Sequence, residues 1–275
     1  MGYGDALMAT GEVLILKKKF PNAKFVVGDG KRSFWSDMFE NNPDIIRAGD
    51  IKKFDKIIWI YNYEKNRPYR IYNEKIEEKN YIWNKKYKAT KGIIYFSSDE
   101  IKFAESIYKK ILEVSENKKI ILIEPNRKND RKNIKGWENR DWGFAKWQKV
   151  VDSLKDQYVF LQTSFGNQPK LKGVINLHNI NFRYTCSIMS RVDLFLGTEG
   201  GLPHAAAALE KKAVVIFGGW IDPKITGYDF HSNLYIDNDI SPCGSKYSCE
   251  HCKECMEKIS IESVIEEINS VFKKA

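Results

Sequence analysis

The segment that decides the fold runs from Val192 to Leu209 and reads VDLFLGTEGGLPHAAAAL. It opens with apolar residues typical of a buried strand, passes through a turn with three glycines, and continues into an alanine-rich helix start. Glycines let the backbone approach a ligand, and the free N–H groups of a first helical turn favour an anion. The segment therefore predicts a diphosphate-binding turn at Gly197, Gly200 and Gly201. The alternative is a tight turn whose glycines serve geometry alone.

Two polar side chains accompany this turn. Glu199 lies between the glycines, where its carboxylate is placed to accept hydrogen bonds from the hydroxyl groups of a sugar or ribose. His204 lies one turn into the helix, where it is placed to reach a phosphate or to order the loop. A purely structural role is the alternative for His204.

Strand and helix signals alternate over the chain on either side of this segment. Continuous apolar strands separated by helices indicate a parallel sheet covered on both faces, and ligands in such sheets lie beyond the carboxyl ends of the strands. The sequence therefore predicts the α/β class, with two Rossmann-like domains at 1–116 and 117–275 and a C-terminal helix packed across them. In the second domain we expect strands at 120–124, 158–162, 174–177, 192–196 and 213–217, and helices at 140–154, 182–190, 202–209 and 261–273.

The first domain carries weaker signals. Ser97 and Glu100 fit a capping box, which predicts a helix from there to about Val114. Residues 64–92 have no clear period and are expected to be irregular or partly helical. The other expected elements are helices at 5–19 and 32–40 and strands at 24–28 and 56–61.

A second glycine-rich helix start lies at the beginning of the chain, at Gly2–Thr10. Asp5 stands at the start of that helix, where a carboxylate commonly caps the backbone N–H groups. Its other candidate role is that of a general base, a carboxylate kept ionised by the helix N-terminus and able to take the proton of an attacking hydroxyl. The residues alone leave both roles open.

Two further loops follow expected strand ends. Residues 126–142 are dense in Lys, Arg and Asn, and Lys132 or Lys135 is placed to neutralise a phosphate; the alternative is a solvated basic loop. The loop at 217–223 carries Trp220, which either stacks on a base or sugar or belongs to the core.

Four of the five cysteines stand close together near the C-terminus. Cys243, Cys249, Cys252 and Cys255 have a spacing compatible with a tetrahedral zinc site, and His251 lies among them. A compact zinc site usually pairs two separated Cys-x2-Cys knuckles, which this chain lacks. We therefore expect no metal and reduced structural thiols, with a metal site of these four cysteines as the alternative.

Composition narrows the class of protein. Lys and Arg number 45 against 36 Asp and Glu, a net charge of +9 that suits a nucleic acid, an anionic membrane surface or an anionic small substrate. The lysines are scattered along the chain, so no nucleic-acid partner is expected, and a zinc-containing nucleic-acid binder is the weaker alternative. Apolar runs fall well short of the ~20 residues that span a membrane, and the first residues lack a secretory signal. We expect a cytoplasmic protein with peripheral contact at the anionic inner membrane face.

Five motifs occur in the order typical of one family. They are GxGDxLxxT at 2–10, KxW at 135–137, EGGxxHxAA at 199–207, FGGxxxP at 217–223 and CMxxIxxxxV at 255–264. In this order the chain resembles the ADP-heptose:lipopolysaccharide heptosyltransferases, glycosyltransferase family 9, over most of its length. The resemblance implies a GT-B fold, with the acceptor on the first of two facing domains and the donor on the second.

The resemblance also implies an activity and a set of site residues. The reaction is an inverting, metal-independent transfer from a nucleotide-sugar donor, such as ADP-heptose, to a glycan or glycolipid acceptor such as a lipopolysaccharide core, and it requires no cofactor. Asp5 matches the catalytic aspartate. The implied donor-binding residues are Asn126, Lys135, Glu199, Gly200, Gly201 and His204, and Gly4, Thr10 and Trp220 are assigned to the acceptor side and its loops.

The chain departs from the family at two places. The family has a strand before the first glycine turn, whereas Met1 stands directly at that turn here, so the first strand is expected to be missing. Glu199 replaces an aspartate of many members and is one methylene longer, which bears on the identity of the sugar. The alternative function is therefore a catalytically impaired nucleotide-sugar-binding protein.

Overall fold

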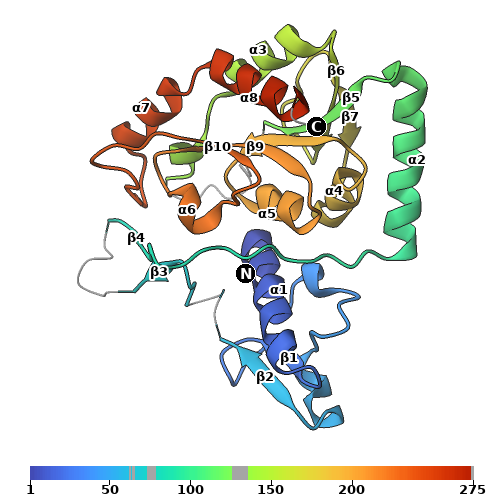
Figure 1. Ribbon diagram of the computed structural model, residues 1–275, viewed down its shortest axis with the longest axis vertical. Helices are drawn as coiled ribbons and strands as arrows, with labels where there is room; N and C mark the ends of the chain where they lie inside the picture. Colours follow the sequence, from blue (N-terminus) through green and yellow to red (C-terminus); the bar gives the residue numbers. More distant parts are fainter. Residues whose placement is uncertain (62, 64–65, 73–78, 126–135, 274–275) are drawn as a thin grey trace.

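The structure is a computed structural model that describes the chain except residues 62, 64–65, 73–78, 126–135 and 274–275. A large sheet with its helices forms one part of the molecule (Figure 1). The first helix, α1 (Tyr3–Lys19), lies below it, and a small sheet lies farther away (Figure 1). An extended segment before the helix α2 (Ser98–Ser115) passes between these parts (Figure 1).

The large sheet is parallel throughout and has six strands in the order β10-β9-β8-β5-β6-β7. Along the chain, β5 forms at the centre of the sheet, β6 and β7 follow toward one edge, and β8, β9 and β10 then follow from the other side of β5 toward the opposite edge. This is the order of a doubly wound nucleotide-binding domain, as predicted for the second domain. The strands are β5 (Lys119–Glu124), β6 (Tyr158–Ser164), β7 (Ile175–His178), β8 (Leu194–Thr198), β9 (Lys212–Gly218) and β10 (Ser232–Tyr235).

Helices cover both faces of this sheet, because alternate strand residues point to opposite sides. In β5, Ile120 and Leu122 belong to one buried cluster, and Ile121 and Ile123 belong to the other. The second cluster includes side chains of α3 and α8, and the first includes side chains of α4 and α5. The bounds are α3 (Phe144–Leu154), α4 (Phe182–Met189), α5 (Gly201–Ala208), α6 (Pro223–Thr226), α7 (Glu250–Lys258) and α8 (Ile261–Lys273), with a 3-10 turn η3 at Trp137–Arg140.

The small sheet has two parallel strands, β1 (Lys24–Val27) and β2 (Ile57–Ile60). Both strands were predicted, but the helix expected at 32–40 reduces to the 3-10 turn η1 (Asp37–Phe39), which Ser36 caps. Before it, Asp29 accepts hydrogen bonds from the backbone of Lys31 and Arg32, and a carboxylate bonded in this way favours a turn. The remaining elements are η2 (Ala48–Lys53) and an antiparallel pair, β3 (Arg70–Ile71) and β4 (Ile82–Trp83).

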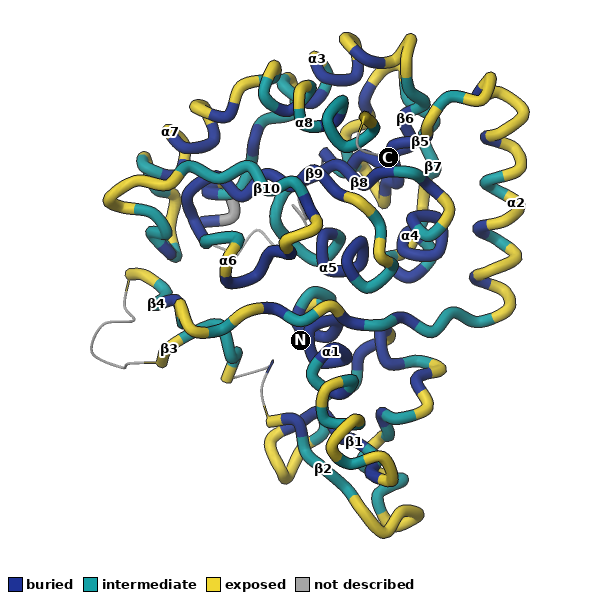
Figure 2. The backbone as a smooth tube through the Cα atoms, viewed as in Figure 1, coloured by how far each residue is buried: buried dark blue, intermediate teal, exposed yellow. Residues whose placement is uncertain are grey.

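α2 begins with the predicted capping box, in which Ser97 and Glu100 bond each other's backbone. Although its residues fall within the predicted first domain, α2 packs against α4 beside the large sheet, and its outer face is exposed (Figure 2). A buried ion pair fixes this contact: Nε and Nη2 of Arg183 in α4 reach the two carboxylate oxygens of Glu100 at 2.6 and 2.7 Å.

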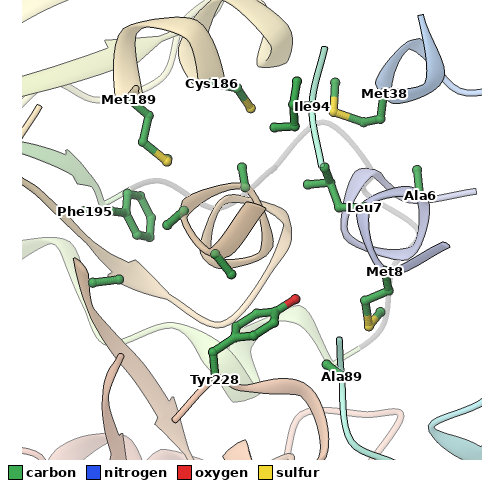
Figure 3. Packing of buried hydrophobic residues seen from close by; sticks show 14 of the residues in the cluster. Ala6, Leu7, Met8, Met38, Ala89, Ile94, Cys186, Met189, Phe195 and Tyr228 are labelled. Carbon is green, nitrogen blue, oxygen red and sulfur yellow. The ribbon is translucent and has the colours of Figure 1, made fainter. Parts of the chain in front are cut away.

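One core joins the first part of the chain to the second. α1 packs against α5, and Leu7 and Met8 of α1 share a buried cluster with Ile94 and Tyr228 (Figure 3). The C-terminal helix α8 packs on α3, β9 and β10, whereas the sequence predicted that it crosses between domains. Its apolar stripe, which includes Val264 and Ile268, is buried against the large sheet. The division into domains at residue 116 stays a prediction.

Among the described residues, no helix combines the length and apolar character needed to cross a membrane.

Candidate functional site

The site is organised by the carboxyl ends of β5 and β8, which are neighbours in the large sheet. Glu124 at the end of β5 stands opposite Gly197 of β8. After β5 the chain builds toward β7, and after β8 it builds toward β10, so the strand order reverses between these two strands. Crevices in doubly wound sheets open at this reversal. Of the three glycines predicted for the turn, Gly197 is instead part of β8, and Gly200 and Gly201 follow the strand at this position.

The glycine turn has a backbone that requires glycine. Gly200 adopts φ 158° and ψ −155°, a conformation essentially restricted to glycine, and it is the N-cap of α5 without a side-chain cap. α5 then begins at Gly201 and carries no acidic residue in its first turn. Its first N–H groups therefore keep their affinity for an anion.

The starts of α1 and α5 meet at this point. A Cβ added to Gly4 would lie 2.8 Å from Cδ2 of His204 and 3.5 Å from Cα of Gly201, so only glycine allows the two helices to come this close. The ring of Tyr3 stacks on the ring of Phe182 from α4, with centroids 4.2 Å apart. Both predicted glycine-rich helix starts therefore belong to one place in the molecule.

Asp5 is the third residue of α1, and the N-cap is Gly2. The capping role left open by the sequence is therefore excluded. The buried carboxylate instead accepts two hydrogen bonds from outside its helix, from Nε of Arg67 at 3.1 Å and from the hydroxyl of Tyr69 at 2.7 Å. Burial, and then the neighbouring Asp5 carboxylate, raise the pKa of Tyr69, which keeps it a neutral donor.

His204 is buried between the two helix starts. Its Nδ1 lies 2.8 Å from the hydroxyl of Tyr228. Burial lowers the pKa of His204 even though the carboxylates of Glu199 and Asp5 act in the opposite direction. A neutral imidazole buried at the junction of α1 and α5 favours the structural role that the sequence analysis gave as the alternative, and a contact with a phosphate stays a prediction.

Glu199 forms an ion pair with Arg140, whose Nη1 lies 2.8 Å from its Oε2. The Arg140 guanidinium in turn lies over the ring of Trp220, 4.4 Å from its centroid. Trp220 is buried and donates from Nε1 to the carbonyl of Ser245 at 2.8 Å. Of the two roles left open for Trp220, these contacts favour membership of the core.

Thr10 does not face an acceptor. It is fully buried, donates to the carbonyl of Leu7 at 2.7 Å, and accepts from the backbone N–H of Ile93 at 2.9 Å. Its hydroxyl thus attaches α1 to the extended segment and has no exposed atom for a substrate. Asn126 and Lys135, together with Lys132, lie outside the described residues.

Three site residues were missed by sequence reasoning. Arg67 and Tyr69, the partners of Asp5, come from the aperiodic stretch 64–92, where no local signal marks them. Arg140 was included in a basic loop expected to bind phosphates, yet it pairs with Glu199. A buried carboxylate needs a cation or another hydrogen-bond donor nearby. Looking for such a partner for each candidate carboxylate would have pointed to these residues.

The cysteine group is also different from the predicted set. The ligating atoms of Cys243, Cys249, Cys252 and His251 all lie within 4.8 Å of one another. Cys255, the fourth member of the predicted set, is outside this group: helix geometry places it one turn farther along α7, where its Sγ lies 3.4 Å from Nε2 of His251.

Comparison with known proteins gives a structural likeness without a sequence match. No family model and no curated protein matches the sequence. A crystal structure described as the glycosyl transferase family 9 from Veillonella parvula has 13% identity and a TM-score of 0.71, and the alignment covers 100% of this chain and 96% of that one. This chain has the fold of that glycosyltransferase.

A second solved protein agrees with this result. The E. coli heptosyltransferase WaaC with ADP has 10% identity and a TM-score of 0.54, with 98% of this chain and 97% of that chain covered. WaaC with ADP-2-deoxy-2-fluoro heptose has 11% identity and a TM-score of 0.50 over the same shares. The predicted fold class, α/β with a parallel sheet of the GT-B type, is confirmed.

Proposed function

We propose that this chain is an inverting glycosyltransferase that moves a sugar, a heptose or a similar one, from a nucleoside-diphosphate donor to a glycan acceptor. The observation that carries the proposal is the meeting of two helix starts at the strand reversal of the sheet. One presents N–H groups at Gly200 and Gly201 that have no hydrogen-bond partner among the described residues, and the other presents the Asp5 carboxylate. An anion site beside a carboxylate base is what transfer from a diphosphate requires.

The donor diphosphate is proposed to lie against the first turn of α5. Backbone N–H groups there bind phosphate oxygens without any charged side chain having to move. Lys135, matched through the sequence resemblance, would neutralise the leaving group. WaaC, which shares the fold, has been solved with ADP and with a fluorinated ADP-heptose, and this supports a donor of the same chemical class.

The transfer is proposed as one displacement at the anomeric carbon. The acceptor hydroxyl loses its proton to the Asp5 carboxylate, its oxygen bonds to the anomeric carbon, and the bond from that carbon to the diphosphate oxygen breaks. Because attack and departure occur on opposite faces, the configuration inverts. The hydrogen bonds from Arg67 and Tyr69 hold the carboxylate in one orientation, and no metal takes part in this step.

The acceptor is proposed to be a glycan or glycolipid, such as a lipopolysaccharide core. The net charge of +9 suits an anionic acceptor or peripheral contact with an anionic membrane face. No nucleic-acid partner is proposed, and the compartment proposed is the cytoplasm.

The proposal is tested with Asp5→Asn, which keeps the shape of the side chain and removes its charge. With the donor found by a thermal-shift panel of nucleoside diphosphates and their sugars, transfer should fall about 10²–10⁴-fold, while donor affinity measured by calorimetry stays within about twofold. The control is Asp50→Asn, which removes an exposed carboxylate that pairs with Lys53 on the surface. Normal turnover in folded Asp5→Asn protein would exclude Asp5 as the base.

A second candidate function is nucleotide-sugar binding without transfer. Nε of Arg67 and the hydroxyl of Tyr69 both donate to the Asp5 carboxylate, so an acceptor hydroxyl would have to compete with them for its oxygens. A wild-type protein that binds the donor but neither transfers nor hydrolyses its sugar, across a panel of glycan acceptors, would favour this function.

A further inference from the structure

The cluster of thiols and imidazole at the start of α7 has the arrangement of a metal site. The Sγ atoms of Cys243 and Cys252 lie 3.1 Å apart, and Nδ1 of His251 lies 4.0 Å from Sγ of Cys252. One ligand atom from each of Cys243, Cys249, His251 and Cys252 lies within 4.8 Å of the others. Around tetrahedral Zn²⁺, with Zn–S near 2.3 Å and Zn–N near 2.0 Å, ligand atoms lie about 3.5–3.8 Å from one another. The observed separations bracket that value.

The ring of His251 has Nδ1 on the side of Cys252 and Nε2 beside Asn238. Oδ1 of Asn238 accepts hydrogen bonds from the backbone N–H groups of Ile240 and Ser241, which identifies it as an acceptor. Nε2 of His251 lies 3.1 Å from this oxygen, 3.2 Å from Oγ of Ser241 and 3.4 Å from Sγ of Cys255. In the tautomer that donates from Nε2 to Oδ1 of Asn238, the lone pair of Nδ1 is available on the side of Cys252, 4.0 Å from its Sγ. A metal-binding histidine is typically oriented by such a bond from its other nitrogen.

The backbone holds the four ligands in place from several segments. Cys243 donates its N–H to the carbonyl of Gly219 at 3.1 Å. Cys249 is the N-cap of α7, and its N–H donates to Oδ1 of the buried Asn139 at 2.9 Å. His251 and Cys252 follow in the first turn of that helix, where the N-terminus stabilises thiolate charge.

We propose that Cys243, Cys249, His251 and Cys252 bind one structural Zn²⁺ ion. Three thiolates and one imidazole are the ligand types of structural zinc sites, whereas oxygen-preferring ions such as Mg²⁺ are disfavoured. A disulfide between Cys243 and Cys252 is the competing explanation, and it would leave Cys249 and His251 without a role.

The ion would stabilise the junction behind Trp220. The loop that carries Cys243 also bonds the residue before β4, because the N–H of Tyr81 donates to the carbonyl of Gly244 at 2.7 Å. Nε1 of Trp83 in β4 and the N–H of Gly244 in the loop both donate to the carbonyl of Trp220, at 3.0 and 3.1 Å. The side-chain amide of Asn139 donates to the carbonyls of Ser245 and Tyr247 in the same loop, at 3.2 and 2.7 Å. Zinc would therefore stabilise the packing of α7, η3 and β4 against the loop after β10. It would take no part in the transfer step.

The test measures metal content and thermal stability in the full chain. Protein purified without chelator, or reduced and reconstituted with ZnCl₂, should contain one zinc per chain by elemental analysis. Substituted Co²⁺ should show thiolate charge-transfer absorption and the visible bands of a tetrahedral ion. Cys249→Ser should bind Zn²⁺ at least tenfold more weakly, and chelator should lower the melting temperature of the wild type but not of this variant.

Cys255→Ser is the matched control, because it removes a buried cysteine of the same helix that is outside the proposed set. It should retain stoichiometric zinc, whereas loss of zinc would replace the proposed set by a four-cysteine site. Asn238→Ala should weaken zinc binding about 10–100-fold if it orients His251. Reduced protein that binds neither Zn²⁺ nor Co²⁺, or a disulfide found between Cys243 and Cys252 in metal-saturated protein, would overturn the proposal.

Discussion

The close contact between the two helix starts makes a quantitative prediction for Gly4→Ala. The added methyl carbon would lie 2.8 Å from Cδ2 of His204, about 0.7 Å inside the usual carbon–carbon contact of ~3.5 Å. The ring cannot turn away freely, because it is buried and its Nδ1 is bonded to Tyr228. Either the ring or α1 must therefore move.

The net cost follows from two opposing effects. Overpacking a rigid site costs about 1–3 kcal/mol, whereas replacing glycine by alanine in a helix returns at most about 1 kcal/mol, and less in its first turn. We expect Gly4→Ala to lower the free energy of unfolding by about 1–2 kcal/mol. For a chain of this size that corresponds to a fall of about 2–4 °C in melting temperature.

The measurement is thermal unfolding followed by calorimetry, with urea unfolding as a second readout. Gly49→Ala is the matched control: nothing lies within 4 Å of its added Cβ, so its stability should stay within about 0.5 kcal/mol of wild type. A Gly4→Ala protein as stable as wild type would refute the close packing of α1 on α5. Equal losses in both variants would show that the contact with His204 is not the cause.

Three further predictions concern charge. Glu100→Gln should lower the free energy of unfolding by about 3 kcal/mol at pH 7 in urea titrations, because it leaves the buried Arg183 without its carboxylate. Burial opposes ionisation of Glu100, but the hydrogen bonds from Arg183 and Ser97 lower its pKa. The ionised carboxylate therefore stabilises the folded protein above pH 4.5, and this contribution is lost as the pH falls through the lowered pKa. In Glu100→Gln, the free energy of unfolding should depend less on pH in this acid range. Burial lowers the pKa of His231 to about 4, so stability should fall as pH drops from 6.5 toward 4, by about 3 kcal/mol, and His231→Leu should remove most of that slope. Lys135→Ala should weaken nucleoside-diphosphate binding at least tenfold by calorimetry, and unchanged affinity would exclude it from the donor site.

The second half of the chain could be predicted well from the sequence because its elements are long and strongly patterned. Continuous apolar strands such as Ile120–Ile123 can only be buried on both faces, so alternating them with helices leaves a parallel sheet as the one solution. The capping box at Ser97 and the glycine turn at Gly200 work through bonds between near neighbours in the chain. Such features need no distant partner to be recognised.

The first half was harder because its contacts are made over long separations. Residues 32–40 have helical spacing, but backbone bonds to Asp29 and a cap from Ser36 favour turns there. One prediction for the second half was also wrong: α8 was expected to cross between domains, and its apolar stripe is instead buried against α3 and the large sheet. Which surface an amphipathic helix covers is decided by packing, which its own sequence does not specify.

The sequence by itself determined the α/β class, the strand-turn-helix unit at Val192–Leu209 and the two glycine-rich helix starts, since each depends on residues adjacent in the chain. Only the tertiary structure decided that these starts meet, with Gly4 against His204, and that Arg67 and Tyr69 bond Asp5 from more than 60 residues away. A buried carboxylate must find donors wherever the folded chain brings them. These donors can therefore lie anywhere in the sequence, and no local sequence pattern predicts them.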